Sequence, residues 1–86
     1  MAKILILEQS KSVRNNLRER LELQGFSTEG ADTPELARRI AQRIAFDAIV
    51  ADRTEGLGDI GLPLIVLSRE SSIDSAVEAI RCGAVD

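Results

Sequence analysis

The feature that most constrains the fold of this chain is a set of short, uninterrupted aliphatic runs at residues 4–7, 48–51 and 64–67. A strand with one solvent-exposed face alternates apolar and polar side chains, whereas a strand buried on both faces is apolar throughout. We therefore predict three strands of a parallel sheet that carries helices on both faces. Residues 26–30 alternate weakly, which predicts a short edge strand.

Helical periodicity occupies the interval after the first strand. Val13, Leu17 and Leu21 recur every four residues, so they share one face of a helix. Ser10 is suited to the N-cap of this helix, because its hydroxyl can accept a hydrogen bond from the first turn. Gly25 is suited to its C-cap.

The second predicted helix has the clearest start in the chain, because Thr33 can cap it and Pro34 suits its first position. A third helix is predicted within residues 71–86, where apolar side chains at helical spacing precede a stop at Gly83. Strands that alternate with helices in this way favour an α/β fold with an open parallel sheet.

Composition bounds the function. The chain has 86 residues, 44% hydrophobic and 29% charged, so we expect one globular domain over residues 1–86. A net charge of −3 argues against direct nucleic-acid binding. With no long apolar run and no secretory leader, we expect a cytoplasmic protein. Histidine is absent and Cys82 is the only cysteine, which removes the usual nucleophile pairs, so we expect no enzyme.

The connection across residues 53–63 is unusually short for two parallel strands. Its eleven residues are close to the minimum of about a dozen for a parallel crossover. Gly56, Gly58 and Gly61 leave room for little more than one helical turn. We therefore expect most of a crossover helix to be missing here.

Polar side chains stand where the predicted strands end: Glu8 and Gln9, then Asp52, then Ser68. In open parallel sheets, ligands collect outside the carboxyl ends of the strands. With this order and spacing, the chain resembles the receiver domains of response regulators, particularly those that precede sigma-54 activator ATPases. The resemblance rests on "KILILEQSKSVRNNLRERLELQGF", "FDAIVAD", "LPLIVLS" and "SSIDSAVEAIRCGAVD". It implies a flavodoxin-like fold that lacks most of the third helix and the fifth strand and helix.

The resemblance also implies roles for these side chains. Asp52 would be the phosphoryl acceptor and Ser68 the hydroxyl that turns toward the phosphoryl group. Glu8 and Gln9 would join Asp52 as ligands of Mg²⁺. Gln9 is neutral and Glu8 is longer than the usual aspartate, and both departures predict weak binding, because Mg²⁺ demands near-ideal octahedral geometry.

The family's lysine, which reaches the phosphoryl group from the fifth strand, has no counterpart at a strand end in this chain. Arg53 and Arg69, directly after Asp52 and Ser68, are candidates to supply positive charge instead. A guanidinium is not a geometric equivalent of an ammonium, however.

Partners follow from the same resemblance. We expect a histidine kinase as phosphoryl donor, an output domain such as a sigma-54 activator ATPase, and a role in transcription regulation. Because no fifth strand would cover residues 64–67, we also expect self-association through that strand or the helix after it.

Plainer interpretations remain open for each residue. Asp52 can simply end a strand, Glu8 and Gln9 can be the solvated end of the strand that leads into the first helix, and Ser68 can cap the next helix or turn. The alternative function is an interaction or dimerisation module, or a designed structural scaffold with the same fold, that takes no phosphoryl group.

Overall fold

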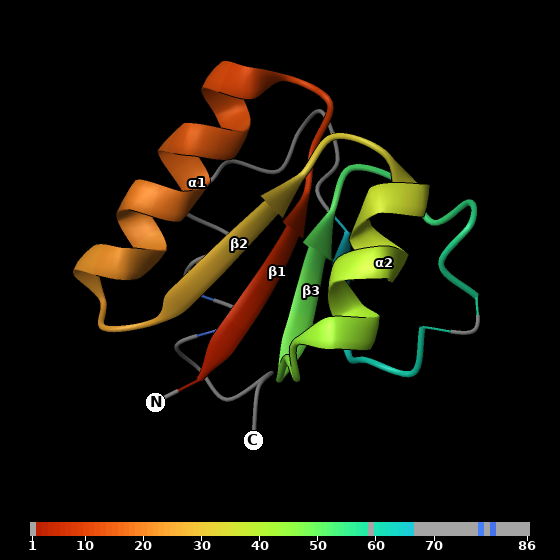
Figure 1. Cartoon of the computed structure of the whole chain (residues 1–86). Coiled ribbons are helices and arrows are strands. Elements are labelled where there is room, and N and C mark those ends of the chain that lie inside the picture. The colour runs from red at the N-terminus through yellow and green to blue at the C-terminus, as the bar shows by residue number, and fades with distance from the viewer. Residues whose placement is uncertain (1, 59, 67–77, 79, 81–86) are drawn as a thin grey trace.

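The computed structural model describes residues 2–58, 60–66, 78 and 80. Its sheet has four parallel strands in the order β2-β1-β3-β4 (Figure 1). This confirms the predicted α/β fold with an open parallel sheet. The described elements are β1 (Lys3–Leu7), α1 (Lys11–Leu23), β2 (Ser27–Ala31), α2 (Pro34–Arg43), β3 (Ala48–Ala51) and β4 (Leu64–Val66).

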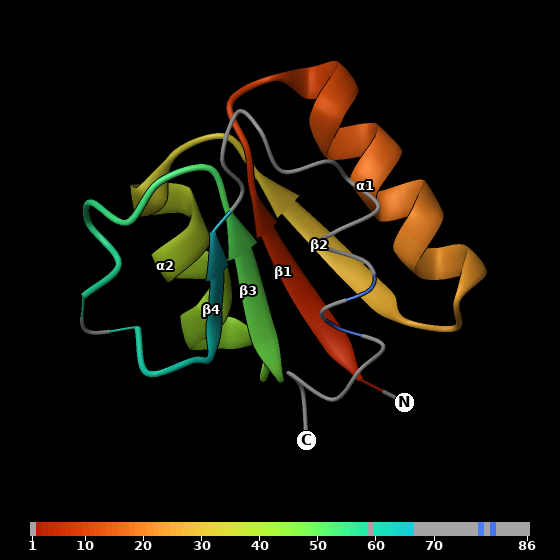
Figure 2. The ribbon, with the colours of Figure 1, turned by 180° about the vertical axis from the view of Figure 1, so that it is seen from behind.

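The sheet is buried on both faces, which explains the uninterrupted aliphatic runs. Ile4 and Ile6 of β1 face the cluster covered by α1, while Leu5 and Leu7 face the cluster covered by α2 (Figures 1 and 2). Because successive side chains of a strand point to opposite faces and both faces are covered, each of residues 4–7 of β1 is a core position. The α1 cluster also contains Leu17, Leu21, Ala48, Val50 and Ile80, and the α2 cluster contains Ala31, Ala37, Phe46, Ile49, Ala51 and Leu57.

Helix α1 begins and ends through local hydrogen bonds. Ser10 is its N-cap, as predicted, and its hydroxyl accepts a hydrogen bond of 3.4 Å from a first-turn backbone N–H. The C-cap is Gln24, one residue before the predicted Gly25. Gly25 follows with a φ of 95°, and the Phe26 N–H donates to the Leu21 carbonyl at 3.1 Å. This is a Schellman ending, in which the glycine stands just outside the helix.

Helix α2 begins where its sequence predicts. The Thr33 hydroxyl accepts a hydrogen bond of 3.2 Å from the Leu36 N–H, and Pro34 is the first helical residue. Proline is tolerated there because the N–H that it lacks would have no partner within the helix.

Strand boundaries differ slightly from the prediction. Strand β1 begins one residue earlier, at Lys3, and the predicted edge strand of residues 26–30 is shifted by one residue to Ser27–Ala31. The shift comes from pairing with β1, where Lys3 lies opposite Ser27 and Leu7 opposite Ala31. Register is a property of the pair of strands, so weak alternation within one of them could not define it.

The short connection between β3 and β4 joins parallel strands, as predicted, and its described residues (53–58 and 60–63) contain no helix. It packs against α2 instead. Leu57 is buried in the α2 cluster, and the Arg38 Nη1 donates to the Gly56 carbonyl at 3.4 Å. The connection therefore covers part of the face that a crossover helix would otherwise cover.

Strand β4 lies at one side of the described sheet and is its most exposed strand (Figure 2). Leu64 is 39% and Val66 46% exposed. The helix predicted within residues 71–86 lies outside the described residues, apart from Glu78 and Ile80, and Ile80 is buried in the α1 cluster. Within the described part of the chain, no helix is long and apolar enough to cross a lipid bilayer.

Candidate functional site

The candidate site lies at the carboxyl ends of β1 and β3, which are neighbours in the sheet. Leu7 lies opposite Ala51, so the residues that follow the two strands emerge side by side. The Asp52 N–H donates to the Leu7 carbonyl at 3.0 Å and fixes this relation. From β1 the chain continues to β2 on one side, whereas β3 lies on the other, and this reversal is where open α/β sheets bind ligands.

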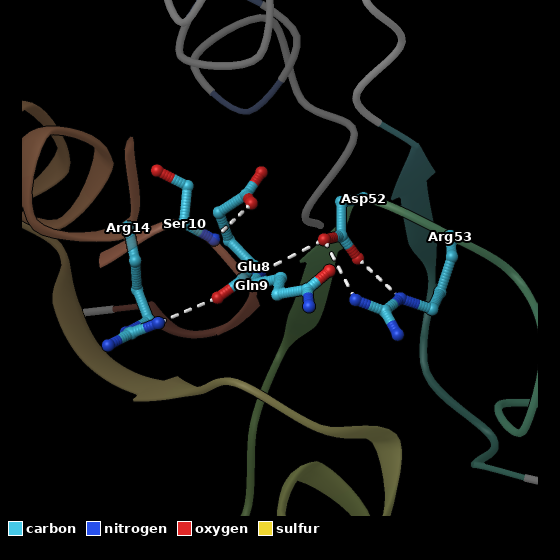
Figure 3. Close-up of polar contacts among 6 residues, drawn as sticks. All are labelled: Glu8, Gln9, Ser10, Arg14, Asp52 and Arg53. Carbon is cyan, nitrogen blue, oxygen red and sulfur yellow. Dashed lines mark hydrogen bonds and ion pairs between the residues drawn. The ribbon is translucent and has the colours of Figure 1, made fainter. Parts of the chain in front are cut away.

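The Asp52 carboxylate is held by three donors (Figure 3). Its Oδ1 accepts a hydrogen bond from the Arg53 Nε at 2.8 Å. Its Oδ2 accepts one from the Arg53 Nη2 at 3.1 Å and one from the Gln9 backbone N–H at 3.0 Å. The Asp52 side chain is 19% and the Arg53 side chain 30% exposed, so the ion pair is in contact with solvent. A bidentate pair of this kind fixes the plane of the carboxylate.

These donors favour the ionised form of Asp52. The Arg53 guanidinium holds the pKa of the Asp52 carboxyl below its ordinary value of 3.8; partial burial acts in the opposite direction, and the Gln9 N–H lowers the pKa further. Hydrogen bonds to the charged form stabilise it. Asp52 is therefore an anion at neutral pH, which is the form that a nucleophilic carboxylate requires.

Glu8 and Gln9 are oriented differently relative to the Asp52 carboxylate. The Glu8 Oε2 accepts a hydrogen bond from the Ser10 N–H at 2.8 Å, so the Glu8 carboxylate is turned toward the start of α1. The Glu8 carbonyl accepts one from the Arg14 Nη1 at 2.7 Å. Gln9 reaches Asp52 through its backbone, while its exposed side chain extends toward the Asp52–Arg53 pair (Figure 3).

The donor set does not form a ready-made magnesium site. Among the described residues, Asp, Glu, His and Cys side chains nowhere gather in a group of three that could hold a metal ion. Both oxygens of Asp52 are engaged by Arg53, Glu8 is engaged by Ser10, and Gln9 is neutral. Magnesium binding through Glu8, Gln9 and Asp52 stays a prediction.

Two of the predicted site residues, Ser68 and Arg69, lie outside the described residues. The structure brings Asp52, Gln9 and Arg53 into direct contact. The Gln9 N–H was not predicted as a donor to Asp52. The sequence signal that could have predicted it is the position of Gln9 just after β1, the strand next to β3. A backbone N–H beyond the end of a strand can lie outside the hydrogen-bond ladder of the sheet and be free to bind a side chain.

The sequence of this chain is similar to those of known regulatory proteins. No family model matches the chain. The chain is 30% identical over 97 residues to the response regulator protein FleR of Pseudomonas aeruginosa and 29% identical over 96 residues to the regulatory protein AtoC of Escherichia coli. These alignments cover 99% and 98% of this chain but 20% and 21% of the relatives. The chain thus spans about a fifth of their length.

Solved structures with the same fold are receiver domains and a response regulator. The receiver domain of a modulated diguanylate cyclase from Desulfovibrio desulfuricans superposes with a TM-score of 0.71 at 22% identity, covering 96% of this chain and 77% of that one. HP1043, an orphan response regulator of Helicobacter pylori, gives a TM-score of 0.74 at 11% identity, covering 99% and 97%. The predicted resemblance to response-regulator receiver domains, and the flavodoxin-like fold that it implied, are confirmed.

Proposed function

We propose that this receiver-like domain, related to response regulators, is a two-component signalling module that accepts a phosphoryl group on Asp52 from a histidine kinase. The observation that supports this best is the state of Asp52 itself. Its carboxylate is ionised, partly exposed, and held at the carboxyl end of the strand next to β1. An anionic oxygen at the sheet's ligand-binding edge is the chemical requirement for an acceptor.

In the proposed transfer, an Asp52 oxygen forms a bond to phosphorus while the phosphorus–nitrogen bond of a phosphohistidine breaks. The electron pair goes to the imidazole nitrogen, which takes up a proton, and the product on Asp52 is an acyl phosphate. Oδ1 accepts one hydrogen bond and Oδ2 accepts two, so Oδ1 has more free lone-pair capacity. Asp52 is consumed once for each phosphoryl group, so the chain has no turnover of its own in this proposal.

Phosphorylation would act on a partner by shifting a two-state equilibrium. A phosphoryl group adds negative charge and acceptor oxygens at the ends of β1 and β3, which changes what this edge of the sheet can bind. The proposed partner is an output domain, such as a sigma-54 activator ATPase that regulates transcription. The relatives are about five times longer than this chain, which agrees with an output region beyond the part compared.

Self-association is the second proposed interaction. Strand β4 is the outer strand of the described sheet and presents Leu64 and Val66 at 39% and 46% exposure. An outer aliphatic strand is a template for pairing with another chain. Light scattering at high protein concentration should then give a mass above that of one chain. A stable monomer would contradict this part of the proposal.

The test of phosphoryl acceptance is the intact mass after incubation with acetyl phosphate, with and without Mg²⁺. Wild type should gain one phosphoryl group, and Asp52→Ala should gain none. Asp32→Ala is the matched control, since Asp32 is an exposed aspartate directly after β2, which pairs with β1 and not with β3. It should behave as wild type does. A folded wild type that gains no mass under either condition, or a gain that persists in Asp52→Ala, would overturn the proposal.

One observation favours a second candidate, an interaction module that takes no phosphoryl group. The Arg53 guanidinium engages both oxygens of Asp52, so a cation of the chain itself already neutralises this carboxylate. In that case the Asp52–Arg53 pair only joins the end of β3 to the connection that follows. The absence of phosphoryl uptake in a sample shown by circular dichroism to be folded would favour this candidate.

A further inference from the structure

We infer that Arg53 is an internal cation that covers both oxygens of the Asp52 carboxylate and competes with divalent metal ions for them. Arg53 is thus a positioning residue, and its guanidinium must leave before Asp52 can ligate a metal ion through both oxygens. The inference about metal ions stands on the geometry alone. Its extension to phosphoryl uptake rests on the proposed function.

The first support is the geometry of the pair. The Arg53 Nε and Nη2 lie 2.8 Å and 3.1 Å from the two Asp52 oxygens, which is a fork-to-fork arrangement in the plane of the carboxylate. A metal ion that binds a carboxylate uses lone pairs of the same two oxygens. The guanidinium therefore occupies the place from which a metal ion would ligate Asp52.

The second support is the charge around Arg53. Besides Asp52, the carboxylates of Glu8 and Glu55 act electrostatically on Arg53. Asp52 is the main partner of Arg53, and the two glutamates act on it only through weaker electrostatic attraction. Removing the Arg53 charge therefore makes the electrostatic potential near Asp52 more negative. A more negative potential attracts a divalent cation to the Asp52 carboxylate, and a nearby fixed positive charge opposes that attraction.

The third support is the position of Arg53 in the chain. It directly follows Asp52, so the pair forms without closing a loop, and little conformational entropy is lost to hold it. The Arg53 side chain is also 30% exposed, which leaves room for it to turn into solvent. The pair is consequently local and has room to open.

The test is a titration with Mn²⁺, followed by electron paramagnetic resonance of the free ion, on wild type, Arg53→Gln and Arg53→Lys. We expect Arg53→Gln to bind Mn²⁺ roughly tenfold more tightly than wild type, as expected when one unit charge about 5 Å from a divalent ion is removed. Arg53→Lys keeps the charge but loses the fork, so its affinity should fall between the two. Asp52→Asn combined with Arg53→Gln should lose the gain.

The matched control is Arg43→Gln, which removes the same charge from an exposed position in the last turn of α2. Its Mn²⁺ affinity should stay within about twofold of wild type, because exposed charges beyond about 10 Å are largely screened at 0.1 M salt. Equal affinities for wild type and Arg53→Gln, or an equal gain in Arg43→Gln, would overturn the inference. Circular dichroism of each variant establishes that it is folded.

Intact mass after acetyl phosphate treatment, measured on the same variants, separates this inference from the proposed function. Tighter Mn²⁺ binding by Arg53→Gln with no phosphoryl uptake in any variant would leave the inference standing and remove the proposed function. Uptake by wild type with an unchanged Mn²⁺ affinity in Arg53→Gln would do the reverse. If both are correct, Arg53→Gln takes up phosphoryl faster than wild type in the presence of Mg²⁺.

Discussion

The backbone N–H of Gln9 donates a hydrogen bond of 3.0 Å to the Oδ2 of Asp52, which is 43 residues away in the sequence at the end of another strand. This bond ties the end of β1 to the carboxylate after β3. It uses the backbone of residue 9, so the Gln9 side chain is free to change without removing it. Residue 9 is therefore the place where an acidic ligand can be added to the site with little disturbance.

Gln9→Asp should tighten Mn²⁺ binding relative to wild type by roughly tenfold, because it adds one negative charge beside Asp52 and Glu8. Titration calorimetry or electron paramagnetic resonance measures the affinity. Gln9→Ala is the control, since it keeps the backbone N–H and adds no charge. A Gln9→Asp variant that binds Mn²⁺ no better than Gln9→Ala would contradict the placement of the site.

The pH dependence of Asp52 follows from its lowered pKa. The folded pKa lies below the ordinary value of 3.8, so the stabilising contribution of the ionised form is fully present above that value and is lost as the pH falls through the folded pKa. Arg53 is the largest cause, so in Arg53→Gln the pKa of Asp52 should rise. Carbon-13 NMR titration of the Asp52 carboxyl group measures it in both proteins.

The contribution of this pair to stability should be small because it is in contact with solvent. We expect Arg53→Gln to change the free energy of unfolding by less than about 1 kcal/mol at neutral pH. Urea unfolding measures the difference, and it should vanish in acid once Asp52 is protonated. A loss of several kcal/mol would show that the pair supports the fold rather than only the site.

Gly56 should be much less tolerant of substitution than Gly58. Gly56 has a φ of 80°, and a Cβ added there would lie 3.0 Å from the Pro34 Cβ, so Gly56→Ala should cost about 1–2 kcal/mol. Gly58 has open space around its would-be Cβ, so Gly58→Ala should stay within about 0.5 kcal/mol of wild type. Thermal or urea unfolding of the two variants tests the packing of the connection on α2.

Helix α1 offers a matched pair of leucines for the core. Leu17 is fully buried in the α1 cluster, so Leu17→Ala should cost about 2–5 kcal/mol of unfolding free energy. Leu23 is 82% exposed, and Leu23→Ala should cost less than about 0.5 kcal/mol. Similar losses in urea unfolding would mean that α1 does not lie on the sheet as described.

The sequence alone predicted the elements whose causes are local. Thr33 and Pro34 predicted the start of the second helix, and the structure confirms it. The aliphatic runs at residues 4–7 and 48–51 predicted strands buried on both faces, which the structure also has. Caps, turns and periodicity depend on neighbours within a few residues, so they can be predicted from the sequence alone. Of the polar residues predicted at the strand ends, the structure brings Gln9 and Asp52 into contact, and Ser68 lies outside the described residues.

Only the tertiary structure decided the register of β2, the donor from Gln9 and the fork of Arg53 on Asp52. Register depends on which residues of two strands lie opposite each other, and those residues are far apart in the sequence. The adjacency of Asp52 and Arg53 was visible, but whether the arginine turned to the carboxylate or to solvent depended on packing around both. The sequence by itself therefore determined the sheet and the position of Asp52 at the end of one of its strands. The tertiary structure decided which groups hold the Asp52 carboxylate, because hydrogen bonds between strand ends exist only once the strands have paired.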